Sequence, residues 1–283
     1  AYTDTVIPRE FTSYEGMIMA ILIHHRWKPE QPIFVDRQHA GRLLGEKLIE
    51  QYGLDVLQSA VVVGCPRGGV IVAQAVQDFL KSKGCFPSLD LVVCRKIPLL
   101  QNSEYGIGAV TESGSPFFLP ELVQRFQVDT TSSSMQDLIE KVQAEVKRRI
   151  SLYRKEKALV SLKDRIVVIV DDGIAGGVTA IAAIKSIREL SQGLVTRIIV
   201  AVPVMSRKAQ SSIMQMEKCD EGDFCSVVLA QPPVGSYWDI EDYYHAGGFA
   251  EVSDTQVIEV MATSSQEKNP CEKFALSDVD ASP

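Results

Sequence analysis

Residues 166–179 constrain what this chain can fold into more than any other part of its sequence. The segment begins with a continuous apolar run over residues 166–170, continues with the adjacent carboxylates Asp171 and Asp172, and then becomes rich in glycine. An uninterrupted apolar run of this length, rich in β-branched residues, is typical of a strand buried on both faces of a parallel sheet. The segment therefore predicts a buried strand, a tight turn and a helix in direct succession.

The turn in this segment has the composition of an anion-binding loop. Its glycines, Gly173, Gly176 and Gly177, allow the backbone to turn with N–H groups pointing into a concavity. A helix that begins near Val178 adds the positive end of its dipole, roughly half a charge, and Thr179 adds a hydroxyl. Ligands of open α/β sheets bind beyond the carboxyl ends of the strands. We therefore expect an anion in the loop and a diol or a magnesium ion beside the acid pair.

Three other interpretations of the segment fit less well. A strand-to-helix turn with an acidic cap explains Asp172-Gly173 but not the full arrangement. A dinucleotide site needs G-x-G-x-x-G with an acid about twenty residues after the glycines, whereas here the acid pair precedes them. A phospho-acceptor receiver domain has its acid pair after the first strand, and in this chain several elements come earlier.

A second loop supports the first. Arg67, Gly68 and Gly69 follow a predicted strand at residues 59–64, again at a carboxyl end. An arginine beside two glycines can present a guanidinium and bare amides to an anion. Together, the two loops indicate two anion sites on one ligand.

A third motif, which is a pair of cations, follows the predicted strand at residues 89–94. Arg95 and Lys96 begin a polar stretch that extends to Tyr105. Two cations at a strand end, leading into a mobile loop, suit a heavily phosphorylated substrate. A solvated loop would explain this pair if it stood alone.

The rest of the chain alternates strands with helices. Asp36 is a predicted N-cap and Gly53 a predicted C-terminal cap of one helix, and Ser134 opens a long helix with Asp137 as its capping-box partner. Further predicted strands lie at residues 107–111, 197–204 and 226–230, and further helices at residues 70–81 and 179–190. This pattern predicts an α/β fold: an open, mainly parallel sheet with helices on both faces.

The domain organisation is expected to have three parts. Residues 1–35 form an N-terminal helical extension, residues 36–262 the α/β domain with a small C-terminal hood, and residues 263–283 a polar acidic tail. The formal net charge of -7 argues against a nucleic-acid partner. None of the six cysteines form a C-x-x-C pair, so a zinc site is not expected.

The compartment follows from the same features. The longest apolar run near the N-terminus, residues 17–23, is too short to span a bilayer and lacks the flanks of a signal peptide. We therefore expect no membrane insertion and an intracellular soluble protein, cytoplasmic or in an organelle interior, with reduced cysteines.

Residues 171–179 resemble the 5-phosphoribosyl-1-pyrophosphate (PRPP) signature of the type I phosphoribosyltransferases. The resemblance extends over roughly residues 34–261, in the motif order of a subgroup of predicted phosphoribosyltransferases of unassigned substrate. The other motifs are Phe34-Val35-Asp36-Arg37, Pro66-Arg67-Gly68-Gly69-Val70, Cys94-Arg95-Lys96, residues 104–110 and Val252-Ser253-Asp254. The resemblance implies a phosphoribosyltransferase that moves a phosphoribosyl group from PRPP to a nitrogenous base or related acceptor and releases pyrophosphate.

The resemblance also implies roles for residues. Asp171 and Asp172 would bind the ribose hydroxyls, and Arg95 and Lys96 would lead into the loop that closes over the reacting centre. Magnesium would bridge the pyrophosphate, with the acid pair as candidate ligands of the ion. The 5-phosphate would lie in a loop formed by Gly173, Ile174, Ala175, Gly176, Gly177, Val178 and Thr179, and the pyrophosphate against Arg67, Gly68 and Gly69. The acceptor base would stack on hood aromatics, with Tyr237 and Trp238 as candidates beside Tyr243 and Tyr244.

One departure from the family pattern leaves an alternative open. The family usually has threonine where this chain has Gly176, so a hydroxyl contact to the phosphate is lost. The alternative is a non-catalytic member that senses PRPP or a nucleotide, or serves as a subunit of a larger assembly. A homodimer is also expected from the family.

Overall fold

The computed structural model describes residues 27–264, except residues 101, 156, 218–223 and 237. Three predicted parts of the chain lie outside the described residues: residues 1–26 of the N-terminal helical extension, the base-stacking candidate Tyr237, and residues 265–283 of the tail.

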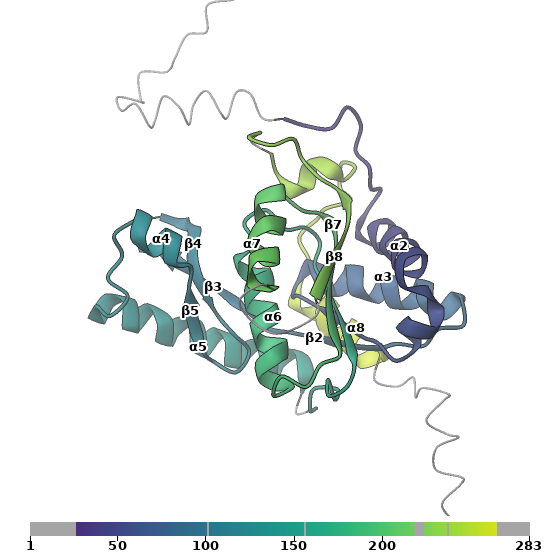
Figure 1. The fold of residues 1–283 in the computed structure, drawn as a ribbon, viewed down its shortest axis with the longest axis horizontal. Coiled ribbons are helices and arrows are strands. Elements are labelled where there is room, and N and C mark those ends of the chain that lie inside the picture. The colour runs from purple at the N-terminus through teal and green to yellow at the C-terminus, as the bar shows by residue number, and fades with distance from the viewer. Residues whose placement is uncertain (1–26, 101, 156, 218–223, 237, 265–283) are drawn as a thin grey trace, which may run out of the picture.

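A five-stranded parallel sheet with the order β2-β1-β6-β7-β8 forms the centre of the molecule (Figure 1). The strands are β1 (Val61–Gly64), β2 (Ser88–Leu91), β6 (Ile166–Val170), β7 (Arg197–Val204) and β8 (Phe224–Ala230). Strands β6 and β7 coincide with the predicted ranges, because both are continuous apolar runs. Every neighbouring pair of strands is parallel, which confirms the expected open parallel sheet.

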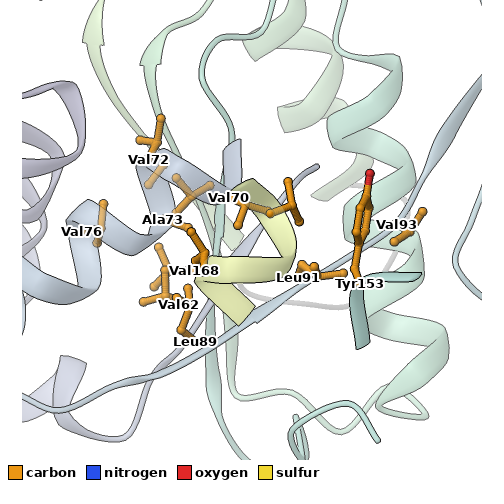
Figure 2. Packing of buried hydrophobic residues seen from close by; sticks show 14 of the residues in the cluster. Val62, Val70, Val72, Ala73, Val76, Leu89, Leu91, Val93, Tyr153 and Val168 are labelled. Carbon is orange, nitrogen blue, oxygen red and sulfur yellow. The ribbon is translucent and has the colours of Figure 1, made fainter. Parts of the chain in front are cut away.

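Helices cover both faces of this sheet, as predicted. One core cluster joins strand residues such as Val62 and Val168 to α2, α3, α5 and α8, and the other joins Val61 and Val167 to α6 and α7. The helices are α2 (Arg37–Gln58), α3 (Gly68–Ser82), α5 (Ser133–Arg154), α6 (Val178–Leu190), α7 (Arg207–Glu217) and α8 (Asp254–Ser264). Alternate strand residues therefore point to opposite helical layers. Figure 2 shows the first cluster, with Ala73 of α3 beside Val168.

The strand order creates a switch point in the sheet, and ligands are expected to bind there. Numbered along the chain, the parallel strands run 2-1-3-4-5, so the connections leave in opposite directions from β1 and β6. Doubly wound sheets bind ligands at such a switch point, beyond the carboxyl ends of the two strands. The arginine loop (residues 65–69) follows β1, and the acid-glycine loop (residues 171–177) follows β6.

A second, antiparallel sheet lies beside the central one (Figure 1). It contains β3 (Arg95–Leu99), β4 (Asn102–Val110) and β5 (Pro116–Phe118), followed by the short helix α4 (Pro120–Arg125). The prediction of an irregular polar stretch from Arg95 to Tyr105 is therefore wrong: this segment is a β-hairpin. Its strand-forming signal is weak because only Ile97 and Leu99 of β3 are buried.

The ends of α2 agree with the prediction from the sequence, and the start of α5 differs from it. The Asp36 side chain accepts from the His39 N–H and caps α2, and Gly53 has φ +76, which interrupts the helix where the cap was predicted. The predicted start of α5 at Ser134 is wrong, because the Ser132 side chain accepts from the Met135 N–H and acts as the N-cap. Asp137 consequently is not its capping-box partner.

A buried ion network connects α5 to both sheets. Arg154, at the end of α5, lies 3.3 Å from Oδ1 of Asp90 in β2 and pairs with Glu112, which follows β4. The Arg154 and Asp90 side chains are 6% and 5% exposed. Glu112 in turn accepts from the Val93 N–H at 2.7 Å. These contacts fix the antiparallel sheet and α5 relative to the central sheet.

The hood, residues 231–253, has a small core of its own. Phe34 forms a parallel bridge with Tyr244, and the two rings lie 5.2 Å apart. Tyr243 and Tyr244 are 1% and 4% exposed, and they pack with Phe34, Ala40 and Val204. The hood includes the 3-10 helix η1 (Ile240–Tyr243). Across the described part of the chain, no helix combines the length and apolar character needed to cross a membrane.

Candidate active site at the switch point of the sheet

The acid-glycine loop is held by hydrogen bonds from its own backbone and from the next strand. The Asp172 N–H donates to Oδ1 of Asp171 at 2.9 Å. Ile174 bridges to Met205, and the Ser206 hydroxyl donates to the Ala175 carbonyl at 2.8 Å. The loop is thus fixed by contacts beyond the end of β7 and does not depend on a ligand for its shape.

The end of this loop leaves the first amides of α6 without a side-chain cap. Gly177 is the N-cap of α6 with φ +84, and its lack of a side chain leaves the first N–H groups of α6 without a capping oxygen. Ala175 and Gly176 are exposed. Open space surrounds the position that a Cβ at Gly176 would occupy. The loop therefore has the geometry of an anion site, with backbone donors and the positive end of a helix dipole.

The arginine loop approaches the acid-glycine loop so closely that only glycine fits. A Cβ at Gly69 would lie 2.8 Å from Oδ1 of Asp171, and a Cβ at Gly68 would overlap Oδ2 of Asp172. The Cys65 N–H donates to the Val170 carbonyl at 2.8 Å, which extends the pairing of β1 with β6 into the loops. The structure thus brings together the two loops that the sequence singled out.

Two residues outside these loops hold Asp172. Nε of Arg37 donates to Oδ2 of Asp172 at 2.8 Å, and the Tyr244 hydroxyl donates to the Asp172 backbone carbonyl at 2.9 Å. The Arg37 guanidinium also lies over the ring of Phe249, 4.0 Å from its centroid. Tyr244 is therefore a buried contact of the acid pair and not an open stacking surface.

Burial and like charge act together on the acid pair. Burial raises the pKa of Asp171 well above its ordinary value, and the neighbouring charge of Asp172 raises it further. Burial also raises the pKa of Asp172, while the charge of Arg37 acts in the opposite direction. The same surroundings raise the pKa of the buried Cys65 thiol. Carboxylates held at such a cost to the fold are typical of functional sites.

Cations line the other side of the site. Arg67 donates to Oε1 of Glu251 at 2.5 Å, and the Arg67 side chain is 32% exposed. Burial lowers the pKa of Arg95, and the nearby charges of Arg149 and Arg67 lower it further. Arg95 and Arg67 therefore lie near each other. Lys96, the next residue of β3, is exposed, and its aliphatic chain covers Gly106.

The hood also borders a cavity. A cavity of about 480 Å³ is lined by Tyr244, His245 and Phe249, with Lys28 and Asp242 at its edge. Trp238, the other predicted base-stacking residue, is half-buried and packs edge-on against Tyr243 at 5.8 Å. Tyr244, whose hydroxyl contacts the Asp172 carbonyl, thus also lines this cavity, together with Phe249.

Comparisons with known proteins agree with this geometry. Two curated proteins of Mycobacterium tuberculosis, both named "Putative phosphoribosyl transferase", are 35% identical to the chain over 173 residues, which is 61% of this chain. The chain spans 36% of the length of these curated relatives. The crystal structure of TT1426 from Thermus thermophilus is 31% identical, has a TM-score of 0.62, and is matched over 98% of its chain and 81% of this one. No protein-family model matches the chain.

The fold defines a doubly wound α/β protein in which the arginine loop and the acid-glycine loop meet at the switch point of the sheet. Over 61% of its length the chain is similar to proteins named as putative phosphoribosyl transferases, and its fold is similar to that of TT1426.

Some contacts in the site were not predicted: Tyr244 was expected only as a stacking residue of the hood, and Arg37 and Glu251 had no assigned role. Arg37, Tyr244 and Glu251 contact the acid pair or the arginine loop, yet none of them was expected there. Arg37 lies in one of the quoted motifs, which was the available signal. Tyr244 and Glu251 are ordinary hood residues in the sequence, and no local pattern distinguishes them.

Proposed function

We propose that this protein binds PRPP at the switch point and transfers its phosphoribosyl group to a nitrogenous base or related acceptor, with release of pyrophosphate. The observation that supports this most is the direct contact of the arginine loop with the acid pair at Gly68 and Gly69. It supports an arrangement in which an anion site lies on each side of a pair of carboxylates. PRPP has the matching order of groups: a phosphate, a diol and a pyrophosphate.

The roles follow from the chemistry of each group. Asp171 and Asp172 accept hydrogen bonds from the ribose hydroxyls, and residues 173–179 hold the 5-phosphate on the amides of α6. Arg67, with the amides of Gly68 and Gly69, binds the pyrophosphate. Arg95 and Lys96 add positive charge at the same end of the ligand.

The reaction breaks the bond between ribose C1 and the pyrophosphate oxygen and forms a bond from C1 to a nitrogen of the acceptor. Positive charge develops on the ribose ring, and negative charge on the leaving pyrophosphate. Fixed donors aimed at that negative charge lower the barrier, which is the role of Arg67 and Arg95. The hood cavity beside Tyr244 and Phe249 is the proposed acceptor site.

The donor set near the acid pair fits magnesium supplied together with PRPP. Within the described residues, no cluster of three or more His, Cys, Asp or Glu side chains could hold a metal alone. Mg²⁺ is commonly bound by one or two carboxylates together with substrate phosphates. Asp171 and Asp172 are the carboxylates that would contribute, and the ion would neutralise charge on the pyrophosphate.

A second function is favoured by Gly176. This position lacks the hydroxyl that the family pattern has, and open space takes its place. A non-catalytic PRPP sensor, or a subunit of a larger assembly, would tolerate the weaker phosphate contact. PRPP binding without pyrophosphate release across a panel of nitrogenous bases would favour this function over the transferase.

Isothermal titration calorimetry of the protein with PRPP, with and without magnesium, tests the proposal. We expect saturable binding that requires magnesium and that Asp171→Asn abolishes. No heat of binding at millimolar PRPP with magnesium would contradict both functions.

A further inference from the structure

Arg37 is a buried cation at the candidate site to which the proposed function assigns no role. Its side chain is 10% exposed and contacts two other parts of the chain, the acid-glycine loop and the hood. Nε donates to Oδ2 of Asp172 at 2.8 Å, Nη1 donates to the Ala250 carbonyl at 2.7 Å, and the guanidinium lies over Phe249. A buried guanidinium is costly unless its donors are satisfied, so this geometry fixes both Arg37 and its partners.

The start of α2 is anchored so that Arg37 reaches the site. Asp36 caps the helix by accepting from the His39 N–H at 2.7 Å. The preceding Phe34 donates its N–H to the Tyr243 carbonyl at 2.9 Å, and its own carbonyl accepts from the His245 N–H at 2.8 Å. Arg37 therefore extends from a rigid helix end that is attached to the hood.

The contact between Arg37 and Asp172 also passes directly against the arginine loop. A Cβ at Gly68 would overlap Oδ2 of Asp172 and would lie 2.8 Å from Nε of Arg37. The ion pair thus needs the bare backbone of Gly68. Arg37 consequently lies where the acid pair, the arginine loop and the hood meet.

We infer that Arg37 is a positioning residue for PRPP: it holds Oδ2 of Asp172 so that Oδ1 faces the ribose hydroxyls. This inference rests on the proposed function. A bond from a guanidinium to one carboxylate oxygen fixes the rotation of the carboxylate, and the charge of Arg37 opposes the rise in the pKa of Asp172 that burial causes. A carboxylate that is fixed before the ligand arrives loses less entropy on binding.

The test compares two ligands in Arg37→Met, which keeps an unbranched, apolar stem but removes the charge and the donors of the guanidinium. Affinities for PRPP and for pyrophosphate are measured by calorimetry on the full chain with magnesium. We expect PRPP affinity to fall about ten- to hundredfold, the usual range for a lost charge-assisted hydrogen bond, and pyrophosphate affinity to stay unchanged. Arg42→Met, an exposed arginine on the same helix, should leave both affinities unchanged.

A double-mutant cycle with Asp172→Asn separates positioning from general damage to the fold. If Arg37 acts through Asp172, Arg37→Met should weaken PRPP binding by less than about twofold once Asp172→Asn is present. Fully additive losses, equal losses for PRPP and pyrophosphate, or wild-type PRPP affinity in Arg37→Met would each overturn the inference.

Two further outcomes can be told apart: Arg37→Met does not fold, or the wild-type protein does not bind PRPP. If Arg37→Met does not fold, Arg37→Lys is measured in the same way; it keeps the charge but cannot bond Asp172 and Ala250 together, so about a tenfold loss of PRPP affinity is expected. Unchanged affinity in Arg37→Lys would then overturn the inference. If the wild-type protein does not bind PRPP, the proposed function fails, and the inference fails with it.

Discussion

At the scale of single residues, glycines determine the geometry of the site, because they have no side chain. Gly68 and Gly69 allow the arginine loop to touch the acid pair, and Gly177 adopts φ +84, which favours glycine. Gly176 differs, since its φ is not positive and open space surrounds it. Three of these glycines are thus required by the fold, whereas Gly176 is free to vary.

Gly68→Ala tests the close approach of the loops. The added Cβ would overlap Oδ2 of Asp172, so the free energy of unfolding should fall by about 1–3 kcal/mol, the usual cost of overpacking. Gly176→Ala is the matched control and should change stability little. Chemical denaturation measures both variants, and equal stabilities would argue against the contact.

Gly176→Thr tests the phosphate loop. A hydroxyl at this position should donate to the 5-phosphate and raise PRPP affinity about tenfold, the effect of about 1.4 kcal/mol. Gly176→Val introduces a side chain of the same shape as threonine but without the hydroxyl, and it should not raise PRPP affinity. Equal affinities of the two variants in calorimetry would show that the phosphate does not lie against residue 176.

Asp171→Asn tests the electrostatic cost of the acid pair. Because burial raises the folded-state pKa of Asp171, its contribution to stability is full below the unfolded pKa of about 3.9 and is lost as the pH rises through the folded value. An asparagine there carries no charge, so this variant should melt above the wild type at pH 7, with a difference that shrinks as the pH falls toward about 4. Thermal melts across pH measure this, with the exposed Asp137→Asn as control. A variant that melts below the wild type at pH 7 would contradict the expectation.

The acid pair and its glycines could be predicted because their signal is local. They follow a buried strand and precede a helix within a single segment. The contact of Arg37 with Asp172 joins residues that are 135 positions apart, and no pattern in one sequence reports such a pair. Tyr244 looked like a stacking residue because an aromatic side chain alone does not show whether its ring is buried.

Two strands with continuous apolar runs, β6 and β7, could be predicted to the residue, whereas the bounds of β1, β2 and β8 differ from the prediction by one to three residues and the polar-faced β3 was not predicted as a strand. Strands β6 and β7 are buried along nearly their whole length, whereas the first two residues of β3 are exposed. The start of α5 lies in a run of hydroxyl residues, Thr130 to Ser134, any of which can cap a helix. Local chemistry therefore left the true cap, Ser132, undecided.

Arg154→Leu tests how the antiparallel sheet and α5 are fixed to the central sheet. Removing this cation leaves the carboxylates of Asp90 and Glu112 buried without a cationic partner, which should cost about 3–5 kcal/mol of unfolding free energy. Arg148→Leu removes a neighbouring arginine of α5 that is 52% exposed, and should cost less than about 1 kcal/mol. Urea denaturation compares the two, and similar costs would show that the buried network does not stabilise the fold.

At the scale of the whole molecule, the strand order is what brings the loops together. β1 and β6 are neighbours in the sheet although about a hundred residues separate them, so the arginine loop and the acid pair meet at the switch point. The central claim is that this meeting point binds PRPP.

Calorimetric titration with PRPP, with and without magnesium, tests that claim most directly. The account predicts saturable, magnesium-dependent binding to the wild type that is lost in Asp171→Asn and weakened in Arg37→Met. Absence of binding to the wild-type protein at millimolar PRPP with magnesium, or unaltered binding in Asp171→Asn, would contradict it.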